Sequence, residues 1–145
     1  MKIMLTDQPC DPWQLIADHQ QSLDAKNKVG AATVFVGSMR DFNLGDDVQS
    51  MFLEHYPGMT ERYLEKIAQQ AEQQWTLHEV LVCHRVGEIH PADAIVVTAV
   101  WSAHRTEAFA ACRFLIEELK HKAPFWKKEH TDKGLRWVEE NTPAE

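Results

Sequence analysis

The sequence lacks the long apolar segments that place a protein in a membrane. No stretch approaches the roughly 20 consecutive apolar residues that span a bilayer. The segment from Met1 to Thr6 reads MKIMLT and lacks the apolar region of a secretory signal. These two absences predict a cytoplasmic protein with no membrane-spanning segment.

Cysteine is scarce, and the usual motifs of metal and nucleotide sites are missing. Cys10, Cys83 and Cys112 are far apart and form no CxxC pair, so neither a disulfide framework nor a zinc site is indicated. Cys83 and Cys112 lie in apolar runs, where we expect core thiols. The eight histidines have no ligand spacing, and the GxGxxG, Walker A, HExxH and GxSxG motifs are absent. We therefore expect no metal and no cofactor, and the sequence does not favour a conventional hydrolase, NTPase or zinc enzyme.

Positive charge is in the minority, yet it is unevenly placed. The chain has 15 Lys and Arg against 22 Asp and Glu, for a formal net charge of −7. Such a chain is a poor candidate for nucleic-acid binding, because that affinity comes from neutralising phosphates with many cations. However, 8 of the 15 basic residues lie between Arg105 and Arg136. This asymmetry favours a local anion site over a nucleic-acid surface.

The composition is that of one ordinary globular domain. The 145 residues are 44% hydrophobic and 26% charged, and they include five Trp and six Phe. A chain of this length buries roughly two-thirds of its unfolded surface, so it needs no disulfide or metal to fold. Because no linker, repeat or low-complexity segment divides the chain, we expect a single domain over residues 1–145.

Apolar periodicity predicts three helices that alternate with strands. Asp11 and Pro12 indicate the start of a helix over 12–23. Thr60 can cap a second helix, and a third runs from near His104 to the stop at Pro124. The apolar stripe of the third helix is Phe109, Cys112, Leu115, Ile116 and Leu119.

The predicted strands are 30–37, 48–55, 79–86 and 94–101, with loops at 38–47 and 87–93. The last strand is almost continuously apolar, which is typical of a central position in a sheet. The expected fold class is therefore α/β or α+β, with a mixed sheet of at least four strands packed against about three helices.

A lysine-rich corner follows the third helix. Lys120 lies on the flank of the apolar stripe, so its stem can pack on apolar surface while its ammonium faces a rim or pocket. After Pro124 comes a Trp-Lys-Lys segment at 126–128. A solvated charged face is the more common explanation for such a cluster.

Basic residues also lie in two other places, each at the end of a predicted strand. His104 and Arg105 lie where a buried strand becomes a helix, a place whose free N–H groups favour anions, although a cap and a surface charge explain them equally well. Arg40 follows the strand that ends near Gly37, and a salt bridge to Asp41 or Asp46 is an equal alternative there. We interpret the segment 84–87 and Asp93 as shaping a turn rather than as acid/base groups.

Five sequence blocks occur in order over about 30–137: FVGSMR at 35–40, LEHYP at 53–57, HRVG at 84–87, SAHR at 102–105, and Lys120 followed by PFWKKE at 124–129. Together they resemble the large, catalytic subunit of molybdopterin synthase. The last two blocks at this spacing are highly specific. The chain departs from the family's pattern at His55, where a more ordinary polar residue is expected, and at Gly58, where an acidic residue is common.

The resemblance implies a sulfurtransferase of molybdenum cofactor biosynthesis. The family converts cyclic pyranopterin monophosphate to molybdopterin by adding two dithiolene sulfurs. Each sulfur arrives as a thiocarboxylate on the C-terminal Gly-Gly tail of a small ubiquitin-like subunit. Two large subunits form a central homodimer, and one small subunit docks at each outer end to give a heterotetramer.

The resemblance also implies a set of site residues. Lys120 and Lys127 are the expected catalytic pair: Lys120 as general acid/base or electrostatic stabiliser beside the thiocarboxylate carbon, and Lys127 as its partner on substrate oxygens. Cations suit both the cyclic phosphate and the thiocarboxylate, and two neighbouring ammonium groups depress a lysine pKa. The implied substrate-binding set is Ser38, Met39, Arg40, His104, Arg105, Lys120, Lys127, Lys128 and Glu129.

The sequence does not say which of these residues come from a second protomer. The alternative function is a noncatalytic module that binds a phosphorylated metabolite or the C-terminal carboxylate of a partner.

Overall fold

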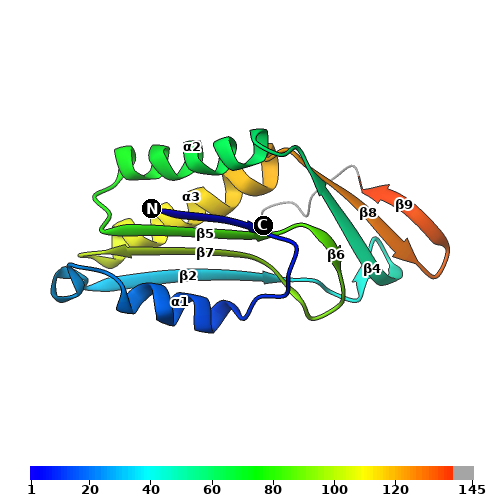
Figure 1. The fold of residues 1–145 in the computed structure, drawn as a ribbon, viewed down its shortest axis with the longest axis horizontal. Coiled ribbons are helices and arrows are strands. Elements are labelled where there is room, and N and C mark those ends of the chain that lie inside the picture. The colour runs from blue at the N-terminus through cyan, green and yellow to red at the C-terminus, as the bar shows by residue number, and fades with distance from the viewer. Residues whose placement is uncertain (139–145) are drawn as a thin grey trace.

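The computed structural model describes residues 1–138, which form two β-sheets and three α-helices (Figure 1). The helices are α1 (Pro12–Gln21), α2 (Met59–Gln74) and α3 (Arg105–Lys122), with a short 3₁₀ turn at Lys26–Lys28. The strands are β1 (Lys2–Thr6), β2 (Ala31–Ser38), β3 (Phe42–Asn43), β4 (Asp46–His55), β5 (Glu79–Arg85), β6 (Gly87–Ile89), β7 (Ala94–Ser102), β8 (Phe125–Thr131) and β9 (Gly134–Val138). The expected α+β class is confirmed.

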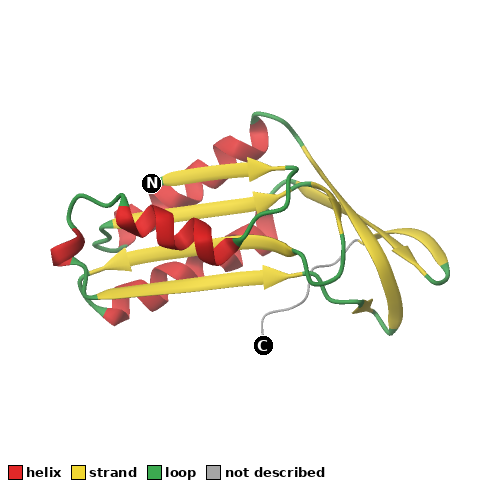
Figure 2. Cartoon of the chain, turned by 60° about the horizontal axis from the view of Figure 1, so that its bottom comes forward, coloured by secondary structure: helices red, strands yellow, loops and turns green. Residues whose placement is uncertain are grey.

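The main sheet has four strands in the order β1-β5-β7-β2. Strand β5 runs parallel to β1 and antiparallel to β7, so the sheet is mixed as predicted. Helices α2 and α3 cover one face and α1 covers the other (Figure 2). Sequence analysis missed β1, whose five residues show no clean alternation because all but the first are only partly exposed. None of the helices within residues 1–138 is long and apolar enough to cross a membrane.

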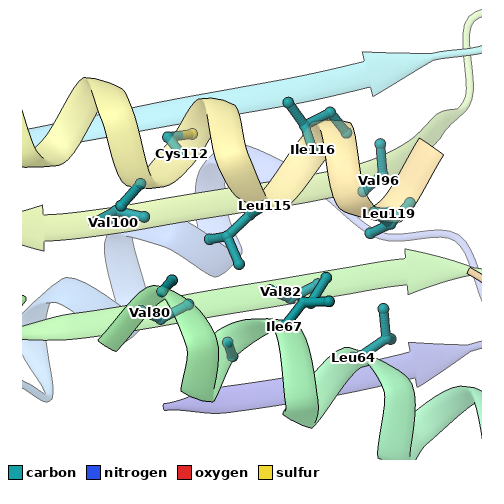
Figure 3. Packing of buried hydrophobic residues seen from close by; sticks show 13 residues of the cluster. Leu64, Ile67, Val80, Val82, Val96, Val100, Cys112, Leu115, Ile116 and Leu119 are labelled. Atoms are coloured by element: carbon teal, nitrogen blue, oxygen red, sulfur yellow. The ribbon is translucent and has the colours of Figure 1, made fainter. Parts of the chain in front are cut away.

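The principal core lies between the main sheet and the α2–α3 pair (Figure 3). Leu115 and Leu119 of α3 are buried there against Val82 and Val96 of the sheet. Phe109 was expected on the buried stripe of α3, but its side chain is 63% exposed. The stripe begins instead at Ala108 and continues through Ala111, Cys112, Leu115, Ile116 and Leu119, because small residues let the first turns of α3 approach the sheet closely.

The second sheet projects beyond the end of the main sheet (Figure 1). Its path is β3-β4-β8-β9, with β6 paired to β4. A separate small core fills its inner face, made of Met39, Val48, Met51, Leu53 and Ile89. The expected loop at 38–47 contains β3, and the connection at 87–93 contains β6. Both strands are only two or three residues long and carry no periodic signal.

The start of α2 is tied to the end of α3. Gly58, and not the predicted Thr60, is the N-cap, and its φ of 82° suits glycine because it has no Cβ. The Gly58 N–H donates to Oε2 of Glu61 at 2.5 Å. Thr60 lies inside the first turn, where its hydroxyl accepts from the Tyr56 N–H and donates to the Pro124 carbonyl at 3.3 Å. This contact anchors the corner that joins α3 to β8.

Replacing Leu115 with Ala should lower the free energy of unfolding by about 2 to 5 kcal/mol, because the change leaves a cavity in the packed core. Leu115 is fully buried, whereas Leu135 is 65% exposed, so Leu135→Ala is a matched control that should change stability by less than about 0.5 kcal/mol. Urea unfolding followed by circular dichroism measures both. Equal effects of the two substitutions would contradict the assignment of this core.

Candidate active site

A polar cavity of about 140 Å³ lies where the end of α3 meets the inner face of the second sheet. Residues from the end of β2 and the loop after it, from α3 and from β8 line it together. Six of the predicted site residues are among them: Ser38, Met39, Arg40, Lys120, Lys127 and Glu129. The fold therefore joins three sequence blocks that are separated by up to 91 residues between Ser38 and Glu129.

The two lysines reach this cavity from different elements. Lys120 lies in the last turn of α3, and Lys127 lies two residues past the start of β8, on the inward side of the strand. The pKa of Lys127 is lowered to about 8, chiefly by burial and also by the neighbouring Lys120, whereas Glu129 acts in the opposite direction. Burial likewise lowers the pKa of Lys120, and the charge of Arg40 adds to this effect. The expected effect of one ammonium group on the other is thus present at Lys127, although desolvation is the larger cause.

Arg40 is held at the cavity by its loop. The Met39 N–H donates to the Asp93 carbonyl, and the Ala92 N–H donates to the Met39 carbonyl, each at 2.9 Å. These two bonds fix the main chain just before Arg40, whose guanidinium lies 4.8 Å from the centroid of the Phe42 ring. Within residues 1–138, Arg40 has no ion pair with Asp41 or Asp46, so the simple salt-bridge explanation for this arginine is wrong. The positive charge of Arg40 therefore lies at the cavity.

Glu129 is a buried carboxylate that is already engaged by protein donors. Its side chain is 5% exposed. Asn43 Nδ2 donates to Oε1 at 2.7 Å, and Arg136 donates to Oε2 at 3.1 and 3.2 Å. Arg136 also bonds Asp46 at 2.6 Å and the Asn43 carbonyl at 2.9 Å. Glu129 thus ties β3 to β8 and β9, and so it orders the wall of the cavity.

Three predicted residues are not brought to this cavity within one chain. Lys128 points to the outer side of β8, where its Nζ lies 5.6 Å from the centroid of the Trp137 ring. His104 is the N-cap of α3 and Arg105 its first residue, and both are exposed. At 1.5 Å per residue, the helix separates Arg105 from Lys120 by about 22 Å along its axis.

A residue that sequence analysis assigned to a turn lies instead beside the lysines. His84, at the end of β5, lines a second cavity of about 70 Å³ together with Lys120 and Lys127. Its ring stacks on Phe125, with centroids 4.1 Å apart. The signal available in the sequence was the HRVG block at the end of a buried strand, the kind of position where α/β proteins often bind ligands.

The thiols do not take part in this site. Cys83 and Cys112 are buried, as predicted, and burial raises the pKa of both, that of Cys83 to about 12. Cys10 lies close enough to Cys83 to add to that shift. Within residues 1–138, no group of three or more His, Cys, Asp and Glu side chains is placed to hold a metal ion.

Comparison with known proteins places the chain in a family. The family model described as MoaE protein matches residues 5–122. The molybdopterin synthase catalytic subunit of Pseudomonas aeruginosa is 49% identical over 140 residues, which cover 96% of this chain and 91% of that protein. The solved structure of the molybdopterin biosynthesis MoaE protein from Burkholderia ambifaria is 43% identical, with a TM-score of 0.79 over 99% of this chain and 92% of that one.

A more distant solved structure, molybdopterin synthase from Staphylococcus aureus, has 28% identity and a TM-score of 0.81 over 94% of this chain and 95% of that one. The α+β fold of this chain is thus shared with solved proteins of molybdopterin biosynthesis. The chain belongs to the MoaE protein family.

Arg136→Ala should destabilise the second sheet more than Lys133→Ala does. Arg136 bonds the buried Glu129 and also Asp46, whereas Lys133 is 73% exposed at its side chain and pairs only with Asp46 among the carboxylates of residues 1–138. Removing Arg136 leaves a buried carboxylate without its cationic partner. Thermal unfolding monitored by tryptophan fluorescence, to which Trp126 and Trp137 of the second sheet contribute, tests this expectation. An equal loss in the two variants would show that the Glu129 contact adds nothing.

Proposed function

We propose that this protein is the catalytic subunit of a molybdopterin synthase. It transfers sulfur to cyclic pyranopterin monophosphate and so builds the two dithiolene sulfurs of molybdopterin. The sulfur donor is the C-terminal thiocarboxylate of a small ubiquitin-like carrier subunit. The protein acts in the cytoplasm, as a single domain over residues 1–145, of which 139–145 lie outside the described residues.

The observation that carries this proposal is the convergence of three cations on one cavity. Arg40 and Lys127 line the same pocket as Lys120, although they come from separate elements. Both proposed ligands are anionic, since one carries a cyclic phosphate and the other a thiocarboxylate. Fixed cations in a partly desolvated site bind such groups strongly, because little water screens the charge. The absence of a thiol from the site agrees with a sulfur that arrives already activated on the carrier.

Each residue of the site has a role in the proposal. Lys120 stands beside the thiocarboxylate carbon as general acid/base or electrostatic stabiliser, and Lys127 contacts substrate oxygens. Arg40 binds the phosphate, for which its forked guanidinium is suited. Ser38 and Met39 position the substrate from the same loop, which the bonds of Met39 to residues 92 and 93 hold in place. Glu129 contributes by orienting the cavity wall through Asn43 and Arg136.

The remaining cations fit a site completed by a second protomer. His104 and Arg105 are exposed at the opposite end of α3 from Lys120. Phe109, one turn further along α3, exposes 63% of its side chain, and Phe35 of the edge strand β2 exposes 38%. In a homodimer, this apolar and basic surface meets the other copy and delivers His104 and Arg105 to its pocket. Each carrier subunit then docks at an outer end, which gives the heterotetramer. Lys128, on the outer side of β8, serves the approach of anionic ligands.

A reconstitution assay tests the function directly. The purified protein is incubated with the cyclic pterin precursor and a thiocarboxylated carrier, and dithiolene product is measured after oxidation to a fluorescent pterin. A noncatalytic anion-binding module would bind either ligand but would form no product.

Lys120→Ala and Lys127→Ala should each reduce turnover by about 10²- to 10³-fold, which is typical for the loss of one oriented electrostatic group. Both lysines lie at the edge of the core, so folding should be nearly intact. Lys122→Ala is the matched control, because Lys122 is 63% exposed at its side chain and pairs only with Glu118 among the carboxylates of residues 1–138. Near wild-type turnover in both site variants would refute the assigned roles.

Mixed dimers should regain activity from two inactive parents. Arg105→Ala and Lys120→Ala subunits, refolded together, form some dimers in which one pocket has both an intact Lys120 and an intact Arg105 from the other chain. We expect up to about one-quarter of wild-type activity from a random mixture, since half the dimers are mixed and each has one complete site. Activity no higher than that of the separate parents would contradict a shared site.

Joint replacement of Cys10, Cys83 and Cys112 by Ala or Ser should leave sulfur transfer working. A cysteine that carries sulfur needs an accessible thiolate, whereas Cys83 and Cys112 are buried with raised pKa values. Stability should fall by about 1 kcal/mol or more per buried thiol, so turnover is compared at a temperature where the variant is folded. A folded variant without activity, rescued by restoring one cysteine, would overturn the lysine-centred mechanism.

A further inference from the structure

Phe42 is an exposed aromatic residue in the wall of the cationic cavity. It lines this cavity of about 140 Å³ beside Arg40, and it is the only aromatic residue among the described residues of that lining. Phe42 is 53% exposed, whereas the apolar residues Val48 and Met51 of the same lining are 4% and 5% exposed because they belong to the small core of the second sheet. Packing of that core therefore does not explain the place of this ring.

A rigid hairpin carries Phe42. The residue opens the two-residue strand β3, which pairs with the start of β4. The turn between these strands consists of Leu44 and Gly45, whose φ angles of 52° and 81° are the positive pair that a tight two-residue hairpin requires. Just before β3, the Asp41 carbonyl accepts from the Val48 N–H at 2.8 Å. The main chain under the exposed ring is thus fixed.

The next residue ties this hairpin to the rest of the cavity wall. Asn43 Nδ2 donates to the buried Glu129 at 2.7 Å, and the Asn43 carbonyl accepts from Arg136 at 2.9 Å. These bonds give the Phe42 ring a defined position at the cavity although the ring itself lies largely outside the core. A defined position on a rigid element is what a binding residue requires.

Arg40 lies against the ring but does not cover it. Its Cζ is 4.8 Å from the centroid of the Phe42 ring, within the range in which an aromatic face attracts a cation. The exposed fraction of 53% is what remains with Arg40 in this place. Phe42 therefore offers surface to a second group beside the guanidinium.

A flat heteroaromatic ring fits this surface. Aromatic rings stack on one another with an offset, and such contacts accept rings of many kinds. The substrate of the proposed function carries a planar pyrimidine ring in its pterin as well as a phosphate. The cations of the cavity suit the phosphate and the thiocarboxylate, but they give the apolar faces of the pterin no apolar partner.

We propose that Phe42 is a substrate-binding residue, on whose exposed ring the pyrimidine ring of the pterin stacks while the cations of the cavity bind the phosphate of the same molecule. This inference rests on the proposed function, because it names the part of the site that recognises the substrate of that function. Phe42 thereby distinguishes a pterin phosphate from other phosphates, which charge alone does not do.

Three variants separate stacking from other roles of this position. Phe42→Leu keeps an apolar side chain and removes the aromatic face. Phe42→Tyr keeps the aromatic face, so it should behave as the wild type does. Leu44→Ala is the control on the same hairpin, because Leu44 is 76% exposed and lies outside the cavity lining.

Binding is measured without the carrier and without turnover. The probes are neopterin 3′-monophosphate, a fluorescent pterin that carries a phosphate, and inorganic phosphate, followed by fluorescence titration and by calorimetry. Phe42→Leu should weaken binding of the pterin probe about tenfold, in the range found for the loss of one stacked ring, and should leave binding of inorganic phosphate unchanged. Phe42→Tyr and Leu44→Ala should bind both probes as the wild type does.

NMR of the wild-type protein gives an independent readout. The H7 proton of the bound pterin probe should shift upfield, because it lies over an aromatic ring. It should also show a nuclear Overhauser effect to the ring protons of Phe42, whose resonances are assigned by comparison with Phe42→Tyr.

Turnover adds a third measurement. Phe42→Leu should raise the KM for the pterin precursor about tenfold, while kcat and the KM for the carrier stay unchanged. An equal loss of affinity for the two probes in Phe42→Leu would overturn the proposal, since the ring would then act only through Arg40. A raised KM for the carrier alone would also overturn it and assign the ring to the carrier tail.

Unchanged binding of the pterin probe in Phe42→Leu would contradict the proposal as well. If that variant does not fold, the absence of any contact between the pterin and Phe42 in the wild-type spectrum does so instead. Absence of product from the wild-type protein would refute the proposed function, while the binding and NMR measurements still decide whether a pterin stacks on Phe42.

Discussion

The packing of Phe125 is the contact on which the geometry of the site depends. Its ring lies against the main core and against the small core of the second sheet, and it stacks on His84. It directly follows Pro124, beyond which β8 begins. Because Lys120 precedes this anchor by five residues and Lys127 follows it by two, one partly buried ring fixes the main chain from which both lysine stems extend. Hydrophobic burial, which has no directionality of its own, thereby determines the arrangement of a charged pocket.

The concentration of positive charge in this pocket is unfavourable when no anion is bound. Burial and the nearby Lys120 depress the pKa of Lys127 to about 8, which indicates that the pocket disfavours the charged form of this lysine. Glu129 compensates only in part, since its oxygens already accept from Asn43 and Arg136. The cores of the two sheets hold the cations together against this repulsion. An anionic ligand relieves the repulsion, so binding free energy comes from charges that folding has already brought into place.

The sequence predicts the parts of the fold that have apolar periodicity and misses the strands that lack it. The three helices and the strands β2, β4, β5 and β7 are found within a few residues of the predictions. Strand β8 was missed because its inward positions carry Lys127 and Glu129, so the expected alternation of apolar and polar residues is absent.

The position of Lys120 on the flank of α3 was predictable from helical geometry alone. The same geometry places Arg105 and Lys120 at opposite ends of α3. The position of His84 beside the lysines could not be predicted, because its ring packs on Phe125, which lies 41 residues further along the chain.

Charge alone does not allow the proposed enzyme to distinguish a loaded carrier tail from a spent one. The tail ends in a thiocarboxylate before transfer and in a carboxylate afterwards, and both are anions. They differ in the size of the terminal atom and in its strength as a hydrogen-bond acceptor, since sulfur accepts more weakly than oxygen. Such a difference is detected only by a donor whose direction is fixed, because a freely rotating ammonium adapts to either atom. Arg40 supplies charge from its loop, whereas Lys120 and Lys127 extend from a helix and a strand that the two cores hold in place. Discrimination between the two tails therefore depends on the packing that holds these elements, and not on the net charge of the pocket.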